Sequence, residues 1–283
     1  MLHPKKKPPM PKLKKMKLNE AIRLLQDAGI DEPVYDAKEI FKRVGGLSPA
    51  DLISRDASTD SDAVISAIER RAKREPLQYI IGEVGFYREV YEVSEACLIP
   101  RSDTEILVDY AVRNIPRGAR FIDLCTGSGC VAVSTLKNTE STTAIALDLS
   151  EDALAVARKN AEKNGVSDRI GFINADVLSY EADGEFYAIL SNPPYVTSAA
   201  YKSLEPEIYF EPRMAFVGGE DGLDFYRSIT HAYKDRLTEG GFIAYEIGFD
   251  QGEALKGIAA SEGMSCAIIK DFSQNDRVAV LKK

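Results

Sequence analysis

Residues 120–283 alternate between short apolar runs and longer stretches in which apolar residues recur at helical spacing. The spaced stretches predict helices, and these lie at 129–137, 150–164, 222–238 and 250–261. The apolar runs predict buried strands, and these lie at 120–124, 143–148, 169–174, 186–191, 241–247, 264–269 and 277–281. Strands that alternate with helices are typical of a doubly wound, mostly parallel sheet. The last two strands are separated by too few residues for a crossover helix, so we expect them to pair antiparallel.

The first hundred residues follow other patterns. Apolar stripes within 18–28, 34–44 and 64–72, with a short helix opening at Ser48-Pro49, predict a small helical bundle. Residues 77–99 are rich in β-branched and aromatic side chains, which predicts a β-hairpin. These apolar side chains belong either to the core or to a contact surface, and the core is the favoured interpretation.

A loop over 99–105 then leads into a helix at about 103–115, for which Ser102 or Asp103 is the expected N-cap. We therefore expect four segments: a basic tail, a helical domain, a hairpin linker and a sheet domain, at residues 1–16, 17–75, 76–100 and 101–283.

Charge and composition narrow the function. The net charge is -8, and because residues 1–17 hold seven lysines and no acid, residues 18–283 carry -15. Residues 18–283 are therefore too acidic to bind nucleic acid well in general. The Pro- and Lys-rich tail is predicted to be disordered, with contact to RNA or an acidic partner as the alternative.

Cysteine and histidine usage predicts reduced thiols and no metal site, since the four cysteines form no C-x-x-C pair and only two histidines occur. No apolar stretch has transmembrane length and no signal-peptide pattern is present, so we expect a cytoplasmic protein with no membrane partner.

The first strand of the sheet domain runs into a glycine-containing loop, Asp123-Leu124-Cys125-Thr126-Gly127-Ser128-Gly129. Gly127 and Gly129 would let a ligand approach the backbone at a helix N-terminus. The segment is neither a P-loop nor a full G-x-G-x-x-G. Taken alone it is equally consistent with a tight turn.

The ends of the next three strands also carry polar groups. Asp148 lies about 20 residues after the loop, where an acid can accept both hydroxyls of a ribose. Asp176 could accept from an adenine amine while Val177 packs against the ring, and Asn192-Pro193-Pro194-Tyr195 ends the fourth strand. Because the carboxyl ends of parallel strands meet at one edge, these groups predict one ligand site there.

This order of groups resembles the S-adenosylmethionine-dependent methyltransferases that act on a planar sp2 nitrogen. An amide nitrogen is a poor nucleophile because its lone pair is delocalised. Asn192 Oδ1 and the Pro193 carbonyl could each accept one N–H and favour pyramidalisation, and Tyr195 could stack on the planar group. No strong base is needed. Asp123 would fix the amides of the loop or meet an amino group of the ligand. The alternative for Asn192 to Tyr195 is a rigid turn.

A set of co-occurring motifs is similar to those of the HemK family, protein-(glutamine-N5) methyltransferases that act on peptide chain release factors. The motifs lie at 76–82, 98–105, 123–129, 191–195, 211–215, 218–226 and 245–248. The resemblance implies a seven-stranded Rossmann-like methyltransferase domain whose last strand is antiparallel, preceded by a helical bundle and a hairpin. It implies methylation of the glutamine in the Gly-Gly-Gln loop of class I release factors 1 and 2, with that glutamine against Asn192, Pro193, Pro194 and Tyr195. It also implies that the helical domain over 17–75 helps to dock the release factor. Cofactor contacts would come from Asp123, Cys125, Thr126, Gly127, Ser128, Gly129, Asp148, Asp176, Val177 and Asn192.

The chain departs from this family at three places. Cys125 and Ser102 replace the usual Gly and Pro, and the lysine-rich tail is additional. Cys125 would either loosen cofactor binding or only require a negative φ, and Ser102 would soften the loop that faces the site.

Three other functions share part of this pattern. Methylation of a ribosomal protein glutamine shares the same motifs. A DNA adenine-N6 methyltransferase needs a basic recognition region, which the acidic body lacks. A non-catalytic cofactor-binding or interaction module would be expected to have lost the glycine loop or the Asn-Pro-Pro-Tyr sequence, and both are present.

Overall fold

The computed structural model describes residues 15–53 and 57–283, which form two compact units divided between Ile81 and Gly82. The predicted disordered tail lies outside the described residues except for Lys15 and Met16. Met16 and Lys17 form a two-residue strand, β1, so the prediction of disorder was wrong at Met16.

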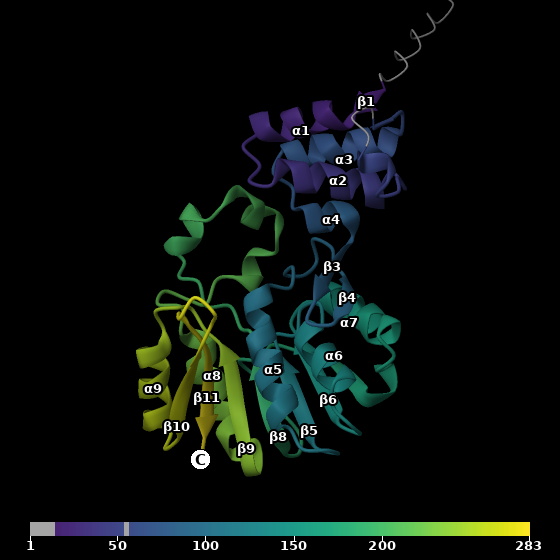
Figure 1. Ribbon diagram of the computed structural model, residues 1–283. Helices are drawn as coiled ribbons and strands as arrows, with labels where there is room; N and C mark the ends of the chain where they lie inside the picture. Colours follow the sequence, from purple (N-terminus) through teal and green to yellow (C-terminus); the bar gives the residue numbers. More distant parts are fainter. Residues whose placement is uncertain (1–14, 54–56) are drawn as a thin grey trace, which may run out of the picture. The chain divides into compact units, whose positions relative to one another are not determined.

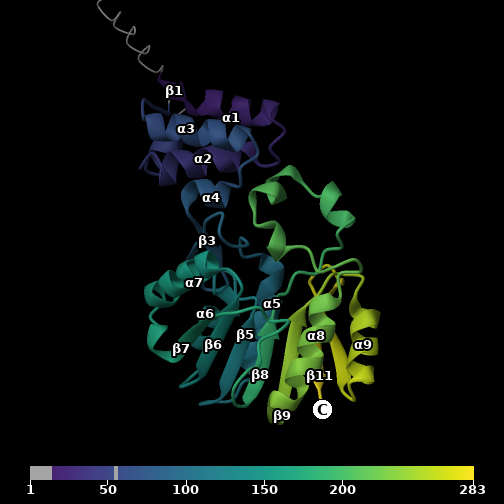
Figure 2. The same ribbon diagram turned by 180° about the vertical axis from the view of Figure 1, so that it is seen from behind.

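The first unit is the predicted helical bundle. Its core contains Leu25, Ile40, Phe41 and Ile68, which are fully buried. The elements are β1 (Met16–Lys17), α1 (Leu18–Asp27), α2 (Pro33–Arg43), a 3-10 turn (Asp51–Ile53), β2 (Ser58–Thr59), α3 (Asp62–Ala72) and α4 (Leu77–Ile81). The helices α1, α2 and α3 lie against one another, as Figure 2 shows, and β1 pairs antiparallel with β2.

The predicted hairpin begins later than expected. Residues 77–81 form the helix α4, whose first turn closes when Tyr79 and Ile80 donate to the Pro76 carbonyl. Leu77 and Ile80, at helical spacing, are buried in the core of the first unit. The prediction of a strand here was wrong. The β-branched and aromatic composition favoured a strand, whereas Leu77 and Ile80, three residues apart, form one buried face of a helix.

The hairpin itself belongs to the second unit and consists of β3 (Glu83–Phe86) and β4 (Glu89–Glu92). Phe86 and Tyr91 are buried in the core of that unit, as favoured, whereas Val90 is exposed.

The second unit contains the predicted seven-stranded sheet, with strand order β10-β11-β9-β8-β5-β6-β7 (Figure 1). The five adjacent strands β9, β8, β5, β6 and β7 are parallel, and β11 runs antiparallel to both β9 and β10. The strands are β5 (Arg120–Leu124), β6 (Thr143–Asp148), β7 (Ile170–Asn174), β8 (Phe186–Ser191), β9 (Leu237–Glu246), β10 (Ser265–Lys270) and β11 (Asp276–Lys282).

Alternate residues of each strand enter different cores, which gives three layers. Phe121 and Phe242 pack on one face with α5 (Glu105–Asn114) and α6 (Cys130–Lys137). Ile122 and Ile243 pack on the other face with α8 (Asp224–Tyr233) and α9 (Gly252–Ser261). Figure 1 shows α5 and α6 on the near side of the sheet. Figure 2, the view from behind, shows α8 on the opposite side. The remaining helix, α7 (Glu151–Lys163), joins β6 to β7. Both faces are covered, as in doubly wound folds.

Two boundaries differ from the prediction. The helix expected over 222–238 is shorter, because after α8 a 3-10 turn (Lys234–Arg236) leads into β9, which already begins at Leu237. The expected N-cap of α5 is also wrong: Thr104 occupies that position, without a capping side-chain bond. Asp103 pairs instead with Arg277, so a distant cation competes successfully with the helix end.

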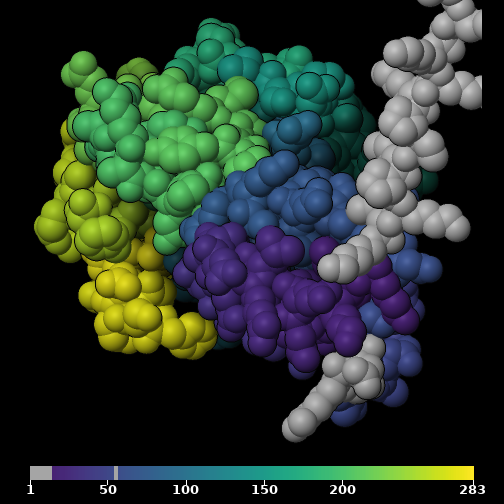
Figure 3. All heavy atoms as spheres, turned by 90° about the horizontal axis from the view of Figure 1, so that it is seen from above, coloured from purple at the N-terminus to yellow at the C-terminus, as the bar shows by residue number. Residues whose placement is uncertain are grey.

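A long segment over 196–223 follows the Asn192–Tyr195 loop after β8 and leads to α8. It contains three short 3-10 helices, at Ala200–Ser203, Pro206–Phe210 and Arg213–Ala215. Figure 3 shows it in green as a continuous part of the surface, next to the yellow-green residues near the C-terminus. In the described part of the chain no helix is long and apolar enough to cross a membrane. Cys125, Cys130 and Cys266 are free thiols.

Candidate active site

One cavity of about 540 Å³ lies at the carboxyl edge of the sheet. All four strand ends singled out in the sequence contribute to it. The predicted site residues that line it are Cys125, Gly127, Asp148, Asp176, Val177, Asn192 and Pro194. The predicted residues that do not line it are Asp123, Thr126, Ser128, Gly129, Pro193 and Tyr195.

The loop after β5 needs left-handed backbone at three positions: Cys125, Gly127 and Gly129 have φ of 61°, 54° and 80°. The expectation of a negative φ at Cys125 is therefore wrong. A Cβ on Gly129 would lie 3.0 Å from the Cβ of Ala157 in α7, whereas one on Gly127 would meet nothing within 4 Å. Gly129 thus serves helix packing, and Gly127 leaves open space beside the cavity.

Asp123 is buried beneath this loop. Its Oδ2 accepts from Thr126 Oγ1 at 2.6 Å and from the Ala132 amide at 3.2 Å. These two bonds connect Asp123 to the loop through the Thr126 hydroxyl and to the start of α6 through the Ala132 amide. Among the described residues its Oδ1 is buried without a hydrogen-bond partner. Burial raises the pKa of Asp123 to about 7 against the lowering effect of these hydrogen bonds.

Asp148, at the end of β6, connects two structural elements. Its Oδ2 accepts from the Gly127 amide at 2.8 Å, and its Oδ1 accepts from the Ser150 amide at 2.9 Å. Burial raises the pKa of Asp148, and the two amides oppose the shift. Each oxygen has a further lone pair for a ligand hydroxyl. Ser150 in turn caps α7 by accepting from Ala153 at 3.1 Å.

After β7, Asp176 forms a turn by accepting from the Leu178 amide at 2.9 Å through Oδ1. Val177 is buried, while Leu178 is largely exposed at the cavity. A carboxylate beside two apolar side chains offers both an acceptor and a packing surface.

The Asn192–Tyr195 loop after β8 is held by close backbone contacts. A Cβ on Gly218 would lie 2.3 Å from the Pro194 carbonyl oxygen, and one on Gly222 would lie 2.2 Å from that of Tyr195. Gln251 Nε2 donates to the Tyr195 carbonyl at 3.1 Å. In the described part of the chain, the Pro193 carbonyl accepts no hydrogen bond.

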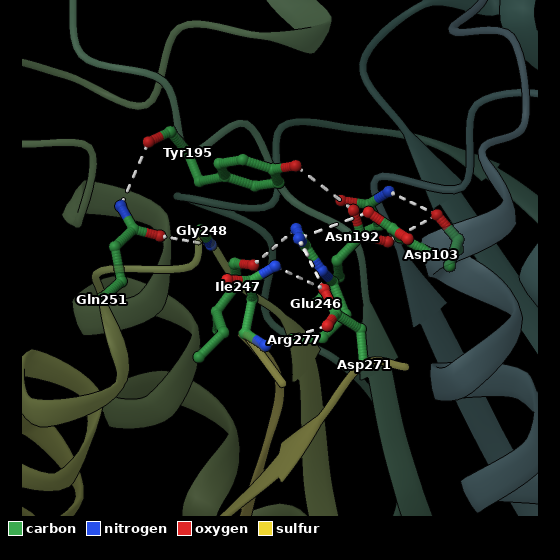
Figure 4. A network of polar contacts seen from close by, with 11 residues as sticks. Asp103, Asn192, Tyr195, Glu246, Ile247, Gly248, Gln251, Asp271 and Arg277 are labelled. Atoms are coloured by element: carbon green, nitrogen blue, oxygen red, sulfur yellow. Dashed lines mark hydrogen bonds and ion pairs between the residues drawn. The ribbon is translucent and has the colours of Figure 1, made fainter. Parts of the chain in front are cut away.

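The two polar side chains of this loop point into a common network, shown in Figure 4. Asn192 Nδ2 donates to Thr104 Oγ1 at 3.3 Å, and Tyr195 Oη donates to Glu246 Oε1 at 3.3 Å. Thr104 Oγ1 donates to Glu246 Oε2 at 2.5 Å. Burial, and secondarily the nearby Glu246, raises the pKa of Tyr195, so its hydroxyl stays protonated.

The sequence assigned no role to several residues that line the cavity, although some lie in the family motifs. They come from two loops and the start of α8, and are Ala96, Cys97, Leu98, Pro212, Arg213, Met214, Ala215, Val217 and Phe225. The buried Glu211 joins the two loops by pairing with Arg101 and accepting from the Ile99 amide at 2.9 Å. Glu211 is a single acidic residue before a proline and belongs to no periodic pattern. Its place in the family motif at 211–215 was therefore the only indication in the sequence that it has a role.

Over residues 15–53 and 57–283, no group of three or more His, Cys, Asp or Glu side chains is arranged to hold an ion.

The chain is similar to proteins of one known family. Residues 17–82 match the family model described as the PrmC N-terminal domain, and residues 102–208 match the methyltransferase small domain. The release factor glutamine methyltransferase of Caulobacter vibrioides is 34% identical over 264 residues, 90% of this chain and 91% of the relative. Those of Thermodesulfovibrio yellowstonii and Agrobacterium fabrum are 38% and 36% identical, covering 88% and 93% of this chain and 92% and 95% of the relatives. The chain therefore belongs to the release factor glutamine methyltransferase family.

Proposed function

We propose that the protein transfers a methyl group from S-adenosylmethionine to the side-chain amide nitrogen of the glutamine in the Gly-Gly-Gln loop of class I release factors 1 and 2. The observation that carries this proposal is the position of Asn192. Its side chain lines the cavity and its Nδ2 is held by Thr104, which leaves Oδ1 to accept an N–H.

The residues at the cavity fit the cofactor. A volume of about 540 Å³ is within the range of cofactor sites, roughly 300–1,000 Å³. Asp148 would accept the ribose hydroxyls, and Asp176 with Val177 would hold the adenine. The glycine loop over 125–129 would adjoin the methionine part, with Asp123 supporting it from below. When bound, S-adenosylmethionine supplies an electrophilic methyl group.

The chain's own contribution is orientation. Asn192 Oδ1 and the Pro193 carbonyl would each accept one N–H of the substrate amide, turning its lone pair out of conjugation. Both acceptors interact more strongly as the nitrogen becomes positive, which favours the transition state. Tyr195 would stack on the amide plane, and the methylated nitrogen then loses a proton to water.

The two units would divide the task. Residues 17–75 would dock the release factor while the second unit carries the chemistry. Such an enzyme would act in the cytoplasm. Methylation of a ribosomal protein glutamine would use the same site, and docking would distinguish the two substrates.

The test is transfer of radiolabelled methyl groups to a panel of a release factor, ribosomal proteins and DNA. We expect label on the release factor, at glutamine. Label on DNA alone, or on a ribosomal protein alone, would overturn the substrate assignment.

Asn192→Ala tests the mechanism. It should lower kcat by roughly 10³-fold, because one of two positioned acceptors is lost, while cofactor affinity changes little. Asn114→Ala, the same substitution at an exposed helix end, is the matched control. Turnover in the Asn192→Ala variant equal to that of the wild type would refute the mechanism.

A further inference from the structure

Glu246 is a buried carboxyl group beside the site for which the proposed chemistry has no role. It ends β9, is 2% exposed, and lies in a motif at 245–248 that the sequence singled out without assigning a function. Both of its oxygens face active-site groups: Oε1 accepts from Tyr195 and Oε2 accepts from Thr104 (Figure 4).

The contacts determine which way the Asn192 amide faces. An ionised carboxylate can only accept, so the Thr104 hydroxyl must direct its hydrogen at Glu246. The Thr104 oxygen then has only lone pairs left for Asn192. It can receive the NH2 group of the amide but repels its oxygen, and Oδ1 is turned away from Thr104.

We propose that Glu246 is a positioning residue for methyl transfer, which acts through Thr104 to keep Asn192 Oδ1 directed at the substrate amide and through the Tyr195 hydroxyl to hold the ring. This inference rests on the proposed role of Asn192. A hydrogen-bonded amide with the wrong orientation would present two donors to a substrate NH2 group, so correct orientation is a condition for binding that group productively.

Charged and titratable groups surround Glu246 on several elements. Arg277 of β11, which also pairs with Asp103 and Asp271, supplies positive charge, and Asp103 adds negative charge. The Tyr195 hydroxyl donates to its side chain from the Asn-Pro-Pro-Tyr loop, and the Tyr226 hydroxyl of α8 donates to its backbone carbonyl. Cys130 of α6 interacts with it electrostatically. Burial outweighs the stabilising effect of Thr104 and Arg277 and raises the pKa of Glu246 to about 7.

Protonation of Glu246 removes the constraint. A protonated oxygen can donate to Thr104, whose own hydrogen is then free to point at Asn192 and to stabilise the inverted amide. The carboxylate predominates above the raised pKa, so kcat should fall as the pH drops below about 7. The variant Glu246→Gln cannot titrate, and its kcat should show no such limb.

Thr104 provides the sharper test, because two variants separate its hydroxyl from its shape. Thr104→Val keeps the volume and removes the hydroxyl, and it should lower kcat by about 10- to 100-fold with cofactor Kd and release-factor KM changed less than about threefold. Thr104→Ser keeps the hydroxyl and should recover most of the lost kcat. Single-turnover methylation of the full release factor by the full chain is the measurement.

A double-mutant cycle with Asn192→Ala shows whether Thr104 acts through Asn192. Thr104→Val should have almost no effect on kcat in the Asn192→Ala background, because no amide remains to orient. A merely structural role would lower kcat by the same factor in both backgrounds and would overturn the inference.

Other outcomes are equally decisive. A normal kcat in Thr104→Val, or an unchanged acid limb in Glu246→Gln, would overturn the inference; the second measurement serves even when Thr104→Val does not fold. Normal turnover in Asn192→Ala would instead refute the proposed function itself, so the two failures can be told apart.

Discussion

Cys125 is a non-glycine residue in left-handed backbone, with φ of 61°. Left-handed conformation costs a residue with a Cβ about 1–2 kcal/mol. Glycine avoids this cost but loses about 0.4–1 kcal/mol through the greater freedom of its unfolded chain. Cys125→Gly should therefore be more stable than Cys125→Ala by about 0.5–1 kcal/mol, since both variants lose the thiol and only alanine keeps the Cβ.

Calorimetric thermal unfolding of the two variants is the assay. A difference of 1 kcal/mol shifts the Tm of a unit of this size by about 2–4 °C, so the Tm of Cys125→Gly should exceed that of Cys125→Ala by about 1–4 °C. Cys266 offers a matched control within β10, where φ is not positive. There the order should reverse, because glycine weakens a strand. A Tm of Cys125→Gly at or below that of Cys125→Ala would refute the reasoning.

Three further predictions concern the same edge of the sheet. Asp148→Asn should weaken cofactor binding by at least about tenfold in calorimetric titration, because an amide has one acceptor oxygen for the Gly127 and Ser150 amides and the ribose; an unchanged affinity contradicts the ribose role. Asp123→Asn should be more stable than the wild type at pH 8, by on the order of 2–4 kcal/mol, and not at pH 4. The sign follows from the raised pKa of Asp123, about 7, because the wild type loses stability as the pH rises from about 4 through 7. Urea unfolding at both pH values is the measurement, and a gain in stability that does not depend on pH contradicts this prediction. Gly218→Ala should lower kcat more than tenfold by displacing the Pro194 carbonyl, whereas Gly171→Ala, which meets nothing within 4 Å, should not.

The sheet and its edge were predictable because their signals are local. An apolar run such as Phe186–Ser191 is a buried strand wherever it packs, and the first polar residue after it must lie at the strand's end. Family motifs then indicated which ligand such an edge accepts.

The missed features depend on residues far apart in the chain. Thr104 meets Glu246 across 142 residues, and Arg277 draws Asp103 away from its helix end. Neither pair has a periodic pattern or a fixed spacing. The prediction for residues 77–81 was wrong for a different reason. Their composition favoured a strand, but burial of Leu77 and Ile80 in the core of the first unit favoured a helix.

The segment over 196–223 returns to its own starting point. The Val196 amide donates to the Phe216 carbonyl at 2.7 Å, the Gly218 amide donates to the Val196 carbonyl at 2.9 Å, and the Ser198 amide donates to the Gly219 carbonyl at 3.1 Å. With the ends tied together, lengthening the chain between them adds little closure entropy, about 0.6 kcal/mol for each doubling. Insertions between Ser203 and Pro206 are thus compatible with an undisturbed Asn192, and this surface is free to diverge, or to be redesigned for another protein substrate, independently of the chemistry beneath it.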